Sequence, residues 1–196
     1  MVKKLWMLSA AMFLGTNLSY AGTYEADKAH SSVNFSVTHL MVSRVNGAFD
    51  DLDAKITFDP ADLAGSSVDA AVKAASINTK NADRDKHLKS ADFFDAEKFP
   101  EITFKTSAIT GSDKQYILEG ELTLHGMTKK VSIPVTIAGP IKSPFGFDAI
   151  GITGQFKLNR QDYGVSWNKT LDSGGVMVSD DVDVAVSIEA HSPAAK

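Results

Sequence analysis

The chain has 196 residues and contains 20 Lys and Arg against 24 Asp and Glu, giving a formal net charge of -4, and it has no cysteine. The charges are mixed along the chain, so no basic stretch of the kind that binds nucleic acid or an anionic membrane is present. The absence of cysteine excludes a disulfide-stapled scaffold and a thiolate metal site. The length suits one domain with a sizeable core.

The first residues have the pattern of a secretory signal peptide. Lys3 and Lys4 precede an apolar stretch, residues 5–14, that is too short to span a bilayer, and Ser19-Tyr20-Ala21 supplies small residues at cleavage-site spacing. We expect residues 1–21 to be removed, leaving one domain over residues 22–196; the alternative is an uncleaved N-terminal anchor. Export without cysteine is typical of a bacterial periplasm.

Most of the remaining chain alternates apolar and polar residues with period two, which predicts half-buried antiparallel strands. Eight long strands are expected, around residues 33–38, 51–59, 68–74, 102–104, 116–124, 131–137, 150–158 and 182–188. Short turns such as His125-Gly126 connect them as hairpins. The strands must close on their apolar faces, and consecutive hairpins favour an all-β, eight-stranded antiparallel barrel over a sandwich.

A barrel of this size is either filled by its own side chains or holds one small ligand. Several small residues fall on inward positions, and we interpret them as leaving room in the lumen: Ala54, Ala70, Ala74, Gly120 and Gly154. The alternative, in which larger inward residues fill that space, stays open at this point.

A charged and aromatic insert, residues 81–99, interrupts the strand pattern between the third and fourth long strands. Asn81 or Asp83 could cap a short helix there, and Pro100 ends the segment. Phe93 and Phe94 are expected to plug one end of the barrel or to line its mouth. Long inserts in compact domains are commonly functional.

Two polar residues continue the inward phase of their strands. His39 follows Val37, and Arg160 follows Leu158. Each is either a structural group with a satisfied partner or a donor to the polar end of a ligand. For Arg160 we expect an acidic partner, such as Asp162 or an acid of the insert.

No catalytic or metal signature is present in the chain. The histidines lack metal spacing, the aspartates do not form a calcium loop, and no nucleophile motif or phosphate-binding glycine loop occurs. We therefore expect no enzyme activity, no metal and no cofactor. An enzyme that acts on a lipid head through His39 or His87 is the weakest of the alternatives.

Five blocks in order make the chain resemble the YceI family, also called the YceI-like or polyisoprenoid-binding domain. The blocks are Asp27-Lys28-Ala29-His30-Ser31 with Phe35, Val37 and His39; Gly47-Ala48-Phe49; residues 84–95 with Phe99-Pro100-Glu101-Ile102; residues 120–129; and Arg160-Gln161-Asp162-Tyr163-Gly164. The resemblance implies a lipocalin-like barrel that holds a long polyisoprenoid or a similar amphiphilic lipid, in a bacterial periplasm.

These observations lead to a main hypothesis and an alternative. The main hypothesis is a periplasmic carrier that sequesters a polyisoprenoid, a quinone-like lipid or a fatty acyl amide. The alternative is an interaction module for a membrane-bound partner, contacted through the insert and residues 139–147, with the barrel as scaffold. A homodimer is compatible with either. The expected ligand-binding residues, with His39, Arg160 and Tyr116 at the head group, are Phe35, Val37, His39, Leu52, Ile56, Phe58, Phe94, Phe104, Tyr116, Leu122, Ile133, Phe156, Arg160 and Val184.

Overall fold

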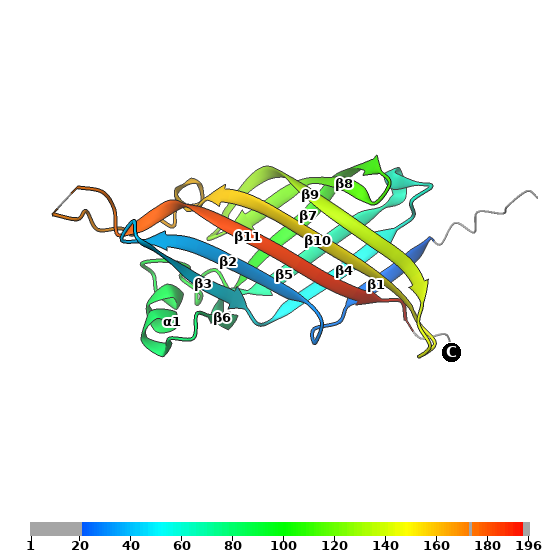
Figure 1. Ribbon diagram of the computed structural model, residues 1–196, viewed down its shortest axis with the longest axis horizontal. Helices are drawn as coiled ribbons and strands as arrows, with labels where there is room; N and C mark the ends of the chain where they lie inside the picture. Colours follow the sequence, from blue (N-terminus) through cyan, green and yellow to red (C-terminus); the bar gives the residue numbers. More distant parts are fainter. Residues whose placement is uncertain (1–20, 173, 194–196) are drawn as a thin grey trace, which may run out of the picture.

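The computed structural model describes residues 21–172 and 174–193, which form a barrel of antiparallel strands with one short α-helix at one end (Figure 1). The predicted signal peptide lies outside the described residues apart from Ala21. The strands and the helix are β1 (Gly22–Ala26), β2 (Ser32–His39), β3 (Ser43–Phe49), β4 (Leu52–Phe58), β5 (Ser67–Lys73), β6 (Ile77–Asn78), α1 (Ala82–Lys89), β7 (Glu101–Ser112), β8 (Gln115–Leu124), β9 (Met127–Lys142), β10 (Asp148–Asn159) and β11 (Val178–His191).

The barrel closes through β11, which pairs with β10 on one side and with both β1 and β2 on the other. β1 and β2 therefore share one strand position, and β3 and β4, which pair with them in turn, share the next. With β5, β7, β8, β9 and β10, this makes eight positions around the barrel. The predicted eight-stranded antiparallel barrel is confirmed, and each of the eight predicted strands is present. β1, β3 and β6 were not predicted.

Large side chains fill one end of the barrel. Tyr24, Ile56, Phe58, Ile137 and Ile150 are almost completely buried. An aromatic edge contact, with ring centroids 5.4 Å apart, joins Phe58 to Tyr116 and adds to the packing there. We refer to this end as the packed end.

The insert lies at the opposite end, the mouth end, together with the β2–β3 connection and the loop that follows β10 (Figure 1). Asn81 caps α1, because its side chain accepts a hydrogen bond of 3.0 Å from the Arg84 N–H. Only the first part of the predicted helical insert is helical, and residues 91–98 form turns. None of the helices in the described ranges is both long and apolar enough to cross a membrane.

A buried threonine fastens α1 to the barrel. The Thr79 hydroxyl donates to the Asp85 carboxylate at 2.6 Å and accepts from Arg84 Nε at 2.7 Å. The Arg84 guanidinium also donates to the Thr79 carbonyl at 2.9 Å. Adjacent charges of the insert thus have a structural task, which is to hold the start of the helix against β6.

Candidate functional site

A hollow lies inside the mouth half of the barrel and has a cavity volume of about 210 Å³. Its wall is formed by residues of β2, β3, β4, β5 and β7 to β11, by Leu88, Phe93 and Phe94 of the insert, and by Arg160 and Val165 after β10. All wall residues are apolar except Thr103 and Arg160. Apolar cavities of this kind take up apolar ligands and have no polar partners to hold ordered water.

The cavity is long relative to its volume. Along β10 and the residue that follows it, wall residues extend from Ile152 to Arg160. Eight residues of strand cover roughly 26 Å along the strand, or about 20 Å along the axis of a barrel with strands tilted by about 40°. This narrow shape suits a flexible chain better than a compact, multi-ring ligand.

Glycines seat aromatic rings against the wall. A Cβ on Gly47 would lie 2.3 Å from the Phe35 ring, and a Cβ on Gly120 would lie 2.7 Å from the Phe104 ring. Neither glycine therefore leaves empty space beside it. The prediction that small inward residues leave room in the lumen is wrong for Gly120, because the Phe104 ring occupies that space. Each glycine acts indirectly, because the absence of a side chain lets a large aromatic ring lie close to the backbone.

The expected ligand-binding residues divide between the two halves of the barrel. Ten of the fourteen lie in the cavity wall, namely Phe35, Val37, Leu52, Phe94, Phe104, Leu122, Ile133, Phe156, Arg160 and Val184. Ile56, Phe58 and Tyr116 point inward but belong to the packed end, so the structure does not place them in the wall. His39 ends β2 beside Val178 and is also outside the wall. The two alternatives for the lumen are thus both realised, one in each half.

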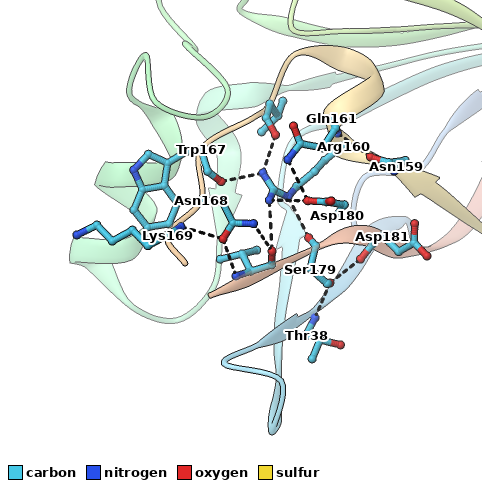
Figure 2. Close-up of polar contacts among 12 residues, drawn as sticks. Thr38, Asn159, Arg160, Gln161, Trp167, Asn168, Lys169, Ser179, Asp180 and Asp181 are labelled. Carbon is cyan, nitrogen blue, oxygen red and sulfur yellow. Dashed lines mark hydrogen bonds and ion pairs between the residues drawn. The ribbon is translucent and has the colours of Figure 1, made fainter. Parts of the chain in front are cut away.

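Arg160 is buried, with only 5% of its surface exposed, and the protein itself uses all of its hydrogen-bonding capacity (Figure 2). Nε donates to the Ser179 carbonyl at 2.9 Å, and Nη1 donates to the carbonyls of Val165 and Trp167 at 2.6 and 2.9 Å. Nη2 donates to the Val178 carbonyl at 3.3 Å and to the Asp180 carboxylate at 3.1 Å. An arginine has five N–H donors, so none remains for a ligand head group.

The acidic partner of Arg160 differs from the predicted one. It is Asp180, whereas Asp162 lies 3.7 Å from Lys129. Burial lowers the pKa of the Arg160 guanidinium from its ordinary value, and the nearby Asp180 carboxylate opposes that effect. The charge is therefore held by contacts with the chain, which fits the structural alternative for this residue.

A bulge in β11 makes these contacts possible. Val178 pairs with His39 and Val182 pairs with Val37, so β11 has extra residues between two register positions. The bulge turns backbone carbonyls toward Arg160 instead of β2. Arg160 thereby connects the end of β10, the following loop and the start of β11, and two of its acceptors, Val165 and Val178, lie in the cavity wall.

Aromatic contacts join the same loop to the insert. The ring of His87 meets the rings of Phe93 and Trp167 edge-on, with centroids 5.0 and 5.1 Å apart. His87 Nε2 also lies 2.9 Å from the Asp92 carboxylate. On the other side, Phe94 packs edge-on against Phe49 of β3, with centroids 5.6 Å apart. The insert therefore completes the cavity wall between β3 and the loop.

One polar cluster outside the cavity has metal-ligand chemistry. Asp27, Glu189 and His191 bring potential ligand atoms within 4.8 Å of one another near the packed end. Each already has a partner, since Asp27 pairs with His30 at 2.6 Å and Glu189 with His191 at 2.8 Å. These ion pairs account for the cluster.

Sequence reasoning missed several wall residues. Leu88, Phe93 and Val165 line the cavity although they lie outside the long strands, and Phe49 lies on a strand that was not predicted. Phe93 was expected at the mouth, but its place in the wall depends on turns after α1 that carry no periodic signal. Other wall residues, such as Leu118, Val135 and Ile152, share the inward phase and could have been selected by it.

Comparison with known proteins places the chain in a family. The model of the YceI-like domain matches residues 24–190. A UPF0312 protein of Staphylococcus aureus (strain MRSA252) is 42% identical over 164 residues, covering 83% of this chain and 94% of the relative. The crystal structure of a Campylobacter jejuni YceI protein has 35% identity and a TM-score of 0.68, covering 85% of this chain and 96% of that one.

A more distant structure shares the fold. A polyisoprenoid binding domain from Saccharophagus degradans has 16% identity and a TM-score of 0.68, and the match covers 88% of this chain and 99% of that one. The family model spans most of the chain and every strand from β2 to β10. The barrel, the insert and the Arg160 block are therefore those of a YceI-like domain, and the chain belongs to that family.

Proposed function

We propose that this protein binds a long-chain amphiphilic lipid, such as a polyisoprenoid, with the apolar tail inside the barrel. The observation that carries the proposal is the narrow cavity, whose wall contains only two polar residues, Thr103 and Arg160. The name of the Saccharophagus degradans domain supports a polyisoprenoid as the first ligand to test. A quinone tail and a fatty acyl amide have the same chemistry.

Burial of the tail supplies enough free energy for useful affinity. Each buried methylene contributes about 0.8 kcal/mol, so ten of them contribute about 8 kcal/mol, which corresponds to a Kd on the order of 1 μM before entropic costs. The methyl branches of a prenyl tail add a similar free energy for each group buried. The cavity therefore needs no polar contact to retain a ligand.

Selectivity should depend on the tail, because Arg160 has no free donor and neither His39 nor Tyr116 lies in the cavity wall. We propose that the head group stays at the mouth, where water can solvate it. Ligands with the same tail and different head groups would then bind with similar affinity. This is the behaviour of a carrier that sequesters its ligand without chemical change.

The proposed setting is the bacterial periplasm, supported by the signal-peptide pattern of residues 1–21. A carrier there would move an apolar lipid through an aqueous compartment. The membrane-protein partner and the homodimer stay predictions.

Organic extraction of the purified protein, followed by mass spectrometry, tests the proposal. Val184→Phe places a ring in the wall between Phe35 and Phe156, which pair with Val184 on either side. It should reduce the amount of bound lipid and the affinity for added prenyl or acyl ligands. Ser187→Phe is the matched control, since it adds the same ring to an exposed position on the same strand. A protein that carries no lipid and takes up none at micromolar concentration would refute the proposal.

A further inference from the structure

Apolar side chains protrude into solvent at the mouth end. Met41 is 65% exposed and Val42 is 84% exposed in the β2–β3 connection, with Leu40 at 38%. Val176, in the loop before β11, is also 38% exposed. We call these four residues the apolar tip.

The backbone conformation of the tip favours glycine or asparagine over the apolar residues that occupy it. The Val42 N–H donates to the His39 carbonyl at 3.2 Å, and the two residues between them, Leu40 and Met41, have φ of 50° and 62°. Positive φ disfavours residues with a Cβ, and tight hairpin turns with this geometry prefer Asn-Gly or Asp-Gly. Among the described non-glycine residues with positive φ, Leu40 and Met41 are the apolar ones.

Other hairpins of the same barrel show the contrast. The β7–β8 turn uses Asp113 and Lys114 at positive φ, and the β8–β9 turn uses His125 and Gly126. Those turns follow the usual preference, with polar residues or glycine. In the tip, Leu40 and Met41 have the unfavourable positive φ, and their apolar side chains are nevertheless exposed to water. A local rule broken in this way, without burial to offset it, is typical of a functional surface.

The tip is continuous with the cavity. The Leu40 N–H donates to the Met177 carbonyl at 2.8 Å, which joins the β2–β3 connection to the loop that carries Val176. Met41 also lies against Gly175, where a Cβ would come within 2.4 Å of its sulfur. The wall residues nearest to the tip on the two strands are Val37, which His39 separates from the tip, and Val178. On the β11 side, the apolar run from Val176 through Met177 to Val178 therefore leads from the exposed tip to the cavity wall.

We propose that the apolar tip inserts into the surface of a lipid bilayer and so positions the mouth of the barrel for transfer of the lipid tail. This inference rests on the proposed function. A second copy of the chain is a poorer occupant, because a stable dimer buries about 800 Å² on each partner, far more than four side chains on a protruding turn provide.

The charges around the tip indicate how the contact forms. Arg44 is paired with Asp183, and Lys169 lies 6.0 Å from the centre of the Trp167 ring. Asp172 is on the same loop as Lys169, so the two Lys or Arg residues on the described parts of the segments that carry the tip each have an acidic or aromatic neighbour. Insertion of apolar side chains, rather than attraction to anionic lipid, is then the source of binding, and the contact should depend little on salt or on anionic lipid content.

Vesicle co-sedimentation tests this inference. The wild-type protein should bind phosphatidylcholine vesicles, with little change when phosphatidylglycerol or salt is added. Leu40→Asn/Met41→Gly should lower vesicle affinity by roughly tenfold or more, since removal of one apolar side chain from the bilayer is enough for that change. The variant should also be more resistant to urea than the wild type, because the new residues suit the turn. A failure to fold therefore cannot explain the loss.

Phe145→Ser is the matched control, because Phe145 is 83% exposed in the β9–β10 connection, at the opposite end of the barrel. It should leave vesicle binding unchanged. The inference would be overturned if the wild type did not bind vesicles, or if the tip variant bound them as well as the wild type. It would also be overturned if the tip variant changed the oligomeric state of the protein in solution and left vesicle binding unchanged. The tip variant should take up a water-soluble short-chain prenyl alcohol as well as the wild type does. If the wild type took up none of this alcohol, that result would count against the proposed function and not against the membrane contact.

Discussion

Replacement of Arg160 by Met should destabilise the protein by about 3–5 kcal/mol, because it leaves several buried carbonyls without a donor, at about 1–3 kcal/mol for each unsatisfied group. The five hydrogen bonds to Val165, Trp167, Val178, Ser179 and Asp180 would add to a larger sum if each counted separately. The cost of burying the guanidinium offsets part of that sum. Carbonyls left without a donor account for much of the net loss.

Urea denaturation measures this loss directly. For a slope of about 2 kcal/mol per molar urea, the midpoint should fall by roughly 1.5–2.5 M. Asp180→Asn is the control, since the Asp180 side chain is 46% exposed and its pairing with Arg160 should contribute less than about 1 kcal/mol. The carbonyl contacts, and not the ion pair, are then the main source of the stability.

Ligand binding separates the two interpretations of Arg160. If Arg160 holds the loop, Arg160→Met should weaken binding of charged and neutral ligands with the same tail by the same factor. If the variant kept its stability and lost affinity only for ligands with an anionic head group, Arg160 would be a head-group contact, and our interpretation of Figure 2 would be wrong.

Three further predictions concern the packed end, the wall and the surface. Ile56→Ala should cost about 2–5 kcal/mol in urea denaturation and leave ligand affinity unchanged, because Ile56 is fully buried outside the cavity wall; a loss of affinity in the folded protein would show that the two ends are coupled. Gly47→Ala should push the Phe35 ring into the lumen and lower the free energy of unfolding by about 1–3 kcal/mol. Lipid uptake measured by mass spectrometry should therefore fall, and unchanged uptake would contradict the role of Gly47 in holding the Phe35 ring against the wall. The hydrogen bond between Asp27 and His30 lowers the pKa of Asp27 from 3.8 and raises that of His30 from 6.5; its stabilisation should be complete between those values, lost as pH falls through the lowered pKa of Asp27, and lost as pH rises through the raised pKa of His30. The urea midpoint of the wild type should therefore exceed that of Asp27→Asn most at about pH 5 and less at about pH 8, and a difference independent of pH would refute the assignment.

The inward face of the barrel could be predicted from sequence because alternation along a strand is a local property. Phe35, Val37, Phe104 and Val184 share a phase with their neighbours, and any closed antiparallel barrel turns that phase inward. Arg160 was identified as an inward polar residue by the same argument. The insert was recognised because its charges and aromatic residues interrupt the alternation.

Depth along the barrel could not be predicted in this way. Ile56 and Leu52 have the same phase on β4, yet Leu52 lines the cavity and Ile56 belongs to the packed end. The difference depends on the stagger between neighbouring strands and on which side chains from other strands reach the same level. Those contacts join residues far apart in the chain, so period-two patterning carries no information about them.

The sequence by itself determined the antiparallel barrel and its eight long strands, the inward face, the position of the insert and the family. The tertiary structure alone decided that the lumen is filled at one end and hollow at the other, and that Arg160 has no donor left for a ligand. It also showed Leu40 and Met41 at positive φ in an exposed turn. The physical reason is the same in each case, since packing, hydrogen-bond saturation and exposure are set by residues distant in the chain, whereas alternation and composition are set by neighbours.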